Sequence, residues 1–95
     1  MPFSLPLTAA LRKAGWQVKI YDAEGPDPPH VSIFRRGKKW RVSLLTGEFL
    51  YPGGTWREID VDVRELIRRE WVTLKIEWNK LHGKLNPIDD VEHRN

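Results

Sequence analysis

Cysteine is absent from the 95 residues of this sequence. Disulfide scaffolds, thiolate zinc sites, iron–sulfur clusters and cysteine nucleophiles are therefore excluded as chemistries of these residues. Long hydrophobic runs are also lacking, and the longest uncharged stretch is far shorter than the ~20 residues of a membrane helix. The apolar start precedes its first charges, Arg12 and Lys13, which is the reverse of a secretory signal. We expect a cytoplasmic protein with no membrane partner.

The motifs of common nucleotide-binding and hydrolase sites are missing as well. The sequence contains no G-x-x-x-x-G-K-[ST], no G-x-G-x-x-G, no G-x-S-x-G and no H-E-x-x-H. A strong excess of one charge is also lacking, since sixteen Lys and Arg face thirteen Asp and Glu. A net charge of +3 permits nucleic-acid binding without requiring it. We predict no cofactor and no metal ion, and an enzymatic activity is not expected.

Hydrophobic residues make up 40% of the sequence, which is typical of a globular domain. Residues 4–14 predict a short helix, with Ser4 or Thr8 as its N-cap. Apolar and polar residues then alternate, which predicts strands; their ranges are 16–22, 30–35, 39–45 and, as an optional fourth strand, 48–51. From Asp60 the period becomes 3.6, which predicts one helix of about 20 residues that ends at Gly83.

This order predicts an α+β fold, in which an antiparallel meander of three to four strands packs one face against the long C-terminal helix. We expect a single domain over residues 1–85, followed by a polar tail over residues 86–95. The strand residues expected in the core are Trp16, Val18, Ile20, Val42 and Leu44. The opposite strand face carries Lys19, Tyr21, Ser32, Phe34, Lys39 and Arg41. The register leaves open whether Trp40 or Phe34 is buried.

Basic residues are concentrated in the predicted hairpin RRGKKWR, residues 35–41. It holds five of the sixteen basic residues, namely Arg35, Arg36, Lys38, Lys39 and Arg41. Such cations neutralise phosphates, and an aromatic side chain such as Trp40 stacks on a base. The alternative interpretation is a solvated hairpin whose charges protect a sheet edge.

A second basic stripe is predicted on the long helix. Arg64, Arg68, Lys75 and His82 fall within about 40° of one another at 100° per residue. They form either a track for phosphates or an acidic partner, or an ordinary solvated helix face. Trp71 and Trp78 are expected in the core. Trp56 is the tryptophan for which we expect the most exposure, as a contact residue.

A third candidate site is the proline-rich loop DAEGPDPPH, residues 22–30. Its acidic residues Asp22, Glu24 and Asp27 precede His30, and a carboxylate can orient a histidine that acts as general acid or base. The same groups could hold a divalent metal ion. The alternative is a polar turn whose histidine begins a strand.

The segments GWQVKIYDAEGPDPPHV (15–31) and LKIEWNKLHGKL (74–85) resemble a small bacterial family of unknown function. Its members carry a Y-x-x-D/E…P-P-H-x-[HV] signature, and the matching residues here are Tyr21, Asp22, Pro28, Pro29, His30 and Val31. The family is suspected of toxin–antitoxin roles beside a second small protein, so the resemblance implies a cognate small protein as partner. A looser likeness, through LRKAGW (11–16) and the element order, is to HicA-type toxins and double-stranded-RNA-binding folds.

Three hypotheses for the function follow. The first is a toxin–antitoxin-like or regulatory module that binds a cognate small protein, with RNA as a further ligand. The second is a non-catalytic module that forms a homodimer or other oligomer through an exposed patch. The third is a ribonuclease with His30 as general acid and base. The third requires His30 to be accessible to solvent on the same surface as the basic hairpin.

Overall fold

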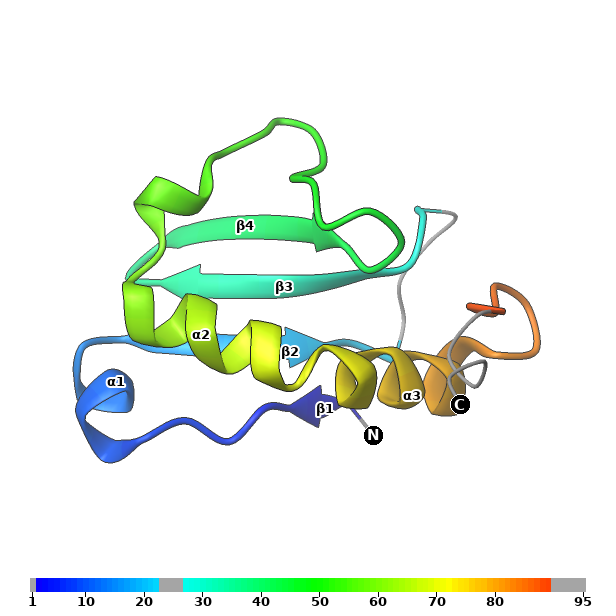
Figure 1. The fold of residues 1–95 in the computed structure, drawn as a ribbon, viewed down its shortest axis with the longest axis horizontal. Helices are drawn as coiled ribbons and strands as arrows, with labels where there is room; N and C mark the ends of the chain where they lie inside the picture. The colour runs from blue at the N-terminus through cyan, green and yellow to red at the C-terminus, as the bar shows by residue number, and fades with distance from the viewer. Residues whose placement is uncertain (1, 23–26, 90–95) are drawn as a thin grey trace.

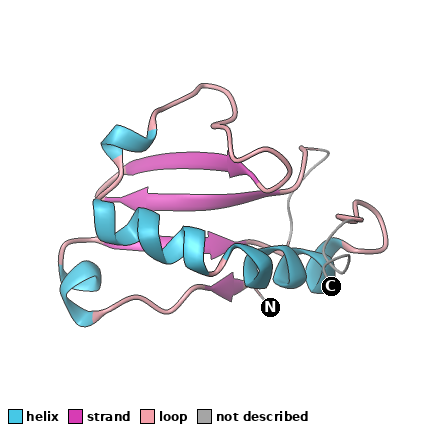
Figure 2. Cartoon of the chain, viewed as in Figure 1, coloured by secondary structure: helices cyan, strands magenta, loops and turns pink. Residues whose placement is uncertain are grey.

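The computed structural model describes residues 2–22 and 27–89. It confirms the α+β class and an antiparallel sheet of four strands. Figure 2 shows these strands together with the helical segments. The elements in chain order are β1 (Phe3–Ser4), α1 (Ala9–Lys13), β2 (Trp16–Ile20), β3 (His30–Arg35), β4 (Lys38–Ser43), the 3₁₀ turn η1 (Trp56–Glu58), α2 (Val61–Arg69) and α3 (Trp71–His82).

The sheet is a meander in which each strand pairs with the next one along the chain, from β1 to β4. A two-residue turn joins β3 to β4, with φ angles of 46° at Arg36 and 87° at Gly37. Two successive positive φ angles match the twist of the flanking strands, so this turn fixes the register of the hairpin. Ile33 consequently pairs with Trp40, which is buried, whereas Phe34 lies on the opposite face.

The core lies between one face of the sheet and the helices. Alternation along β2 turns Trp16, Val18 and Ile20 into this core, as predicted. Figure 1 shows α2 and α3 crossing in front of the sheet. The buried residues that the helices add to the core are Leu11, Val63, Ile67, Leu74 and Trp78. These helix residues belong to one hydrophobic cluster with Trp16, Val18 and Ile20 of β2.

The N-terminal helix is shorter than predicted. Helix α1 begins after Thr8, whose side chain accepts a hydrogen bond from the Leu11 backbone N–H at 3.2 Å. Leu5 precedes a proline, and residues before proline avoid the helical region. The backbone there is extended instead, so that Phe3 pairs with Ile20 across β1 and β2.

The optional strand over residues 48–51 is not formed as a strand. Phe49 makes only an isolated bridge with Val42. Two backbone hydrogen bonds hold the segment beside β4. The Ser43 N–H donates to the Glu48 carbonyl at 2.8 Å, and the Leu50 N–H donates to the Arg41 carbonyl at 2.9 Å. The fourth strand is β1, at the other edge of the sheet.

The single long helix predicted from Asp60 is two helices. Glu70, with φ −101° and ψ 22°, leaves the helical region and separates α2 from α3. Neither proline nor glycine lies near this position, so the sequence pattern carries no sign of the break. The four cations predicted to share one stripe are consequently divided between two helices.

The predicted polar tail is in part anchored on α3. Ile88 is buried, and its backbone exchanges two hydrogen bonds with the side-chain amide of Asn79, at 2.8 and 2.9 Å. The Asn86 carbonyl accepts a hydrogen bond from the Trp78 indole at 2.7 Å. Residues 86–88 are therefore held against α3. Residues 90–95 of the predicted tail lie outside the described residues.

Candidate nucleic-acid interface on the open sheet face

The face of the sheet opposite the helices combines aromatic and basic side chains. We call it the open face, and define it by Lys19 and Tyr21 on and after β2, Phe34 on β3, and Lys39 and Arg41 on β4. Strand alternation and the register bring these residues together, since Lys39 lies opposite Phe34 and Arg41 opposite Ser32. The sequence predicted this set of residues on one face.

Two aromatic rings form the centre of the open face. The rings of Tyr21 and Phe34 meet edge to face, with centroids 6.1 Å apart. Ser32 lies between them in the register and is 1% exposed. The Lys39 ammonium lies 5.5 Å from the Phe34 ring centroid and 6.0 Å from that of Tyr21. An ammonium at this distance is attracted to the ring face and places a positive charge beside the aromatic surface.

The remaining basic groups on the open face differ in their pairing. Arg41 forms an ion pair with Asp27 and donates a second hydrogen bond, at 2.7 Å, to the Tyr51 carbonyl. These contacts fix its guanidinium and offset its charge. Lys19 lies opposite Ser4 and Ser32 in the adjacent strands. Lys19 and Lys39 are therefore the lysines placed to meet phosphates on this face.

Strand alternation divides the predicted basic hairpin between two faces. Lys39 and Arg41 lie on the open face, whereas Arg35 and Lys38 lie on the core side. There, the Arg35 guanidinium is 5.3 Å from the Trp16 ring centroid and donates to the Ala14 carbonyl at 3.0 Å. The Lys38 ammonium is 5.8 Å from the Trp40 ring centroid. Arg36 is exposed at the turn between the two faces.

The hairpin is tied to η1 through a carboxylate. Glu58 Oε1 accepts a hydrogen bond of 2.8 Å from the Trp40 indole and one of 3.4 Å from the Thr55 backbone N–H. These two hydrogen bonds, with a smaller contribution from the charge of Lys38, hold the pKa of Glu58 below its ordinary value of 4.5.

This lowered pKa predicts a pH-dependent contribution to stability. The contribution is present above pH 4.5 and is lost as the pH falls through the lower, folded-state value, because protonation then favours the unfolded chain. Urea unfolding of Glu58→Gln should show a shallower loss of the free energy of unfolding on acidification than the wild-type protein. Equal pH dependence of the two proteins would contradict this assignment.

His30 does not meet the condition set for a catalytic role. Its side chain is 0% exposed, and its ring packs against Trp78 with centroids 5.7 Å apart. His30 Nδ1 donates to the Pro28 carbonyl at 2.9 Å, since a carbonyl can only accept. His30 also begins β3, at the end opposite the basic turn. We therefore leave it out of the candidate site. Of the acidic residues predicted beside it, Glu24 lies outside the described residues.

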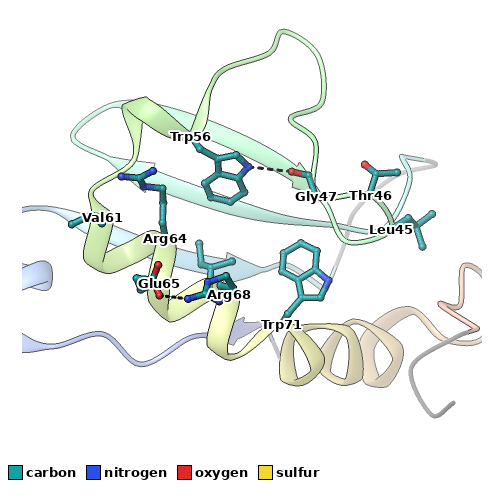
Figure 3. A pocket seen from close by; sticks show the side chains of 10 residues that line it. Leu45, Thr46, Gly47, Trp56, Val61, Arg64, Glu65, Arg68 and Trp71 are labelled. Carbon is teal, nitrogen blue, oxygen red and sulfur yellow. Dashed lines mark hydrogen bonds and ion pairs between the residues drawn. The ribbon is translucent and has the colours of Figure 1, made fainter. Parts of the chain in front are cut away.

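The basic residues predicted on the long helix lie away from the open face. Lys75 is on α3, and the His82 ring stacks on Trp78 and donates to the Tyr21 carbonyl at 2.7 Å. Arg64 and Arg68 line a groove of about 500 Å³ between α2, η1 and the loop after β4. Figure 3 shows this groove.

Two tryptophans line the same groove. Trp56 is partly buried there, and its indole donates to the Gly47 carbonyl at 3.2 Å. Trp71, predicted in the core, is only partly buried and also lines the groove, whereas Trp78 is fully buried as predicted. The helical period of the sequence could not indicate that Trp71 is less buried than Trp78, because Trp71 directly follows the break in the helix at Glu70.

Comparison with protein-family models, curated protein sequences and solved structures finds no match to this chain. The resemblance to the small bacterial family and to HicA-type toxins therefore stays a prediction from the sequence. Among residues 2–22 and 27–89, no helix has the length and apolar character to cross a membrane. The same residues contain no cluster of three or more His, Asp or Glu side chains suited to a metal ion.

Proposed function

We propose that this protein binds single-stranded RNA on the open face of its sheet. The observation that carries the proposal is the contact of Lys39 with the paired rings of Tyr21 and Phe34. Flat rings provide surfaces on which unpaired bases stack, and nearby lysines neutralise the phosphates that join those bases. The proposal deepens one part of the first sequence hypothesis, in which RNA is a ligand.

The shape of the face supports a single strand rather than a duplex. Four strands at a spacing of about 4.8 Å give a sheet only about 15 to 20 Å wide. Two rings at its centre suit two or three splayed bases. Bases in a duplex are stacked on one another, so their flat sides are not available to Tyr21 or Phe34.

The geometry supports binding rather than cleavage. A general acid or base must come within hydrogen-bond reach of the atom that it protonates. His30 is enclosed between Pro28 and Trp78. The other described histidine, His82, is turned toward Trp78 and the backbone of Tyr21. The ribonuclease hypothesis therefore receives no support from the placement of these rings.

Binding can be measured by fluorescence anisotropy with a labelled, mixed-sequence oligoribonucleotide of about 12 nucleotides. We expect Lys19→Gln/Lys39→Gln to weaken binding about tenfold and to reduce the slope of log affinity against log salt by about 1. The matched control is Lys80→Gln/Lys84→Gln, which removes the same charge in the last turn of α3 and two residues beyond its end.

The control variant should bind like the wild type. If both double variants lose the same affinity, the effect is one of net charge, and the assignment to the open face is wrong. A duplex of the same sequence that binds more tightly than the single strand would also contradict the proposal.

A further inference from the structure

The groove on the helix side of the molecule is distinct from the open face and has its own chemistry. Figure 3 shows the indoles of Trp56 and Trp71 projecting into it from η1 and α3, with Arg64 and Arg68 beside them on α2. Its volume of about 500 Å³ lies within the range of small-molecule sites. Leu45 and Val61, each 55% exposed, form apolar parts of its wall.

The two arginines of the groove differ in their exposure to solvent and in their hydrogen bonds. Arg68 donates to Glu65 at 2.6 Å, and its side chain is 77% exposed. Arg64 is partly buried, and its Nε is inaccessible to solvent and has no hydrogen-bond partner among the described residues. Because no solvent reaches this Nε, the terminal nitrogens of the Arg64 guanidinium are the donors that a ligand in the groove can meet.

We propose that this groove binds a small aromatic carboxylate. The two indoles suit a planar ring, which stacks on them or meets them edge to face. The Arg64 guanidinium suits the carboxylate, because its planar fork donates two parallel hydrogen bonds. Glu65 already forms an ion pair with Arg68, so Arg64 is the group that gives the groove its preference for a carboxylate ligand.

The carboxylate preference is open to direct test with 2-naphthylacetate and its neutral analogue 2-naphthylacetamide. Each tryptophan gives one indole N–H signal in a ¹H–¹⁵N NMR spectrum, and the variants Trp56→Phe and Trp71→Phe assign the two signals of the groove. We expect saturable shifts of these two signals with 2-naphthylacetate, at a dissociation constant of about 1 mM or tighter. The amide should bind about tenfold more weakly, since it lacks the charge.

Arg64→Gln should abolish the preference for the carboxylate over the amide. Arg64→Lys keeps the charge but not the planar fork, and should retain only part of the preference. Arg68→Gln is the matched control and should change the affinity by less than about threefold, as expected for an exposed group. Unchanged ¹H–¹⁵N signals from residues outside the groove show that each variant is folded.

Three results would overturn the proposal. The first is the absence of a saturable shift up to the solubility limit of the carboxylate. The second is equal affinity for the carboxylate and the amide in the wild-type protein. The third is tighter binding of a tetrapeptide with naphthylalanine beside aspartate, because the groove would then be a site for a protein segment. The RNA affinity of Arg64→Gln should equal that of the wild type, which separates this site from the open face.

Discussion

Replacing Phe34 with leucine is expected to weaken the binding of single-stranded RNA about tenfold. Leucine keeps most of the apolar bulk on β3 but has no flat ring on which a base can stack, and such stacking contributes about 1 to 3 kcal/mol per base. The Lys39 ammonium, 5.5 Å from the ring centroid, also loses the aromatic face that it contacts. Fluorescence anisotropy with the same labelled oligoribonucleotide measures the change.

Phe34→Tyr serves as the control for this prediction, because tyrosine retains the ring. It should bind within about twofold of the wild type, while the salt dependence of Phe34→Leu should stay unchanged, since no phosphate contact is removed. If leucine and tyrosine bind equally well, stacking on this residue does not contribute to affinity. Thermal unfolding of both variants tests whether the sheet itself is intact.

Replacing Trp78 with alanine is expected to lower the free energy of unfolding by about 3 to 5 kcal/mol. Trp78 is 0% exposed and joins α3 to the sheet through its contact with His30 and to the C-terminal segment through the Asn86 carbonyl. A domain of this size has about 5 to 15 kcal/mol of stability in total. The variant should therefore unfold at a much lower urea concentration, as followed by circular dichroism.

Two further variants separate the causes of this loss. Trp78→Phe keeps a large ring but leaves the Asn86 carbonyl without its donor, which costs about 1 to 3 kcal/mol. Trp71→Ala removes an indole that is only partly buried, so it should destabilise the protein less than Trp78→Ala. Equal losses for Trp71→Ala and Trp78→Ala would contradict the burial that distinguishes them.

The strands and their faces could be predicted because alternation is a local property of the chain. In β2, every second residue from Trp16 to Ile20 is apolar, and one register places all of them in the core. The same alternation placed Tyr21 and Phe34 on the open face together with Lys19, Lys39 and Arg41. The hairpin turn was also readable, since Gly37 permits the positive φ that a tight turn requires.

Other predictions failed where distant residues decide the outcome. The helical period continues past Glu70, but the chain bends there and places Trp71 in the groove. Extended backbone before Pro6 finds a partner in β2, which a reading of residues 4–14 alone does not include. The sequence left the burial of His30 open, and Trp78, 48 residues later in the chain, packs against its ring.

By itself, the sequence determined the α+β class, the antiparallel meander of β2, β3 and β4 and the residues of the open face, because periods of two and 3.6 are set by backbone geometry. Only the tertiary structure decided the burial of His30, the break between α2 and α3, and the groove at Arg64. These features depend on contacts between segments far apart in the chain. No local pattern of polarity contains such contacts, so they arise only when the helices pack on the sheet.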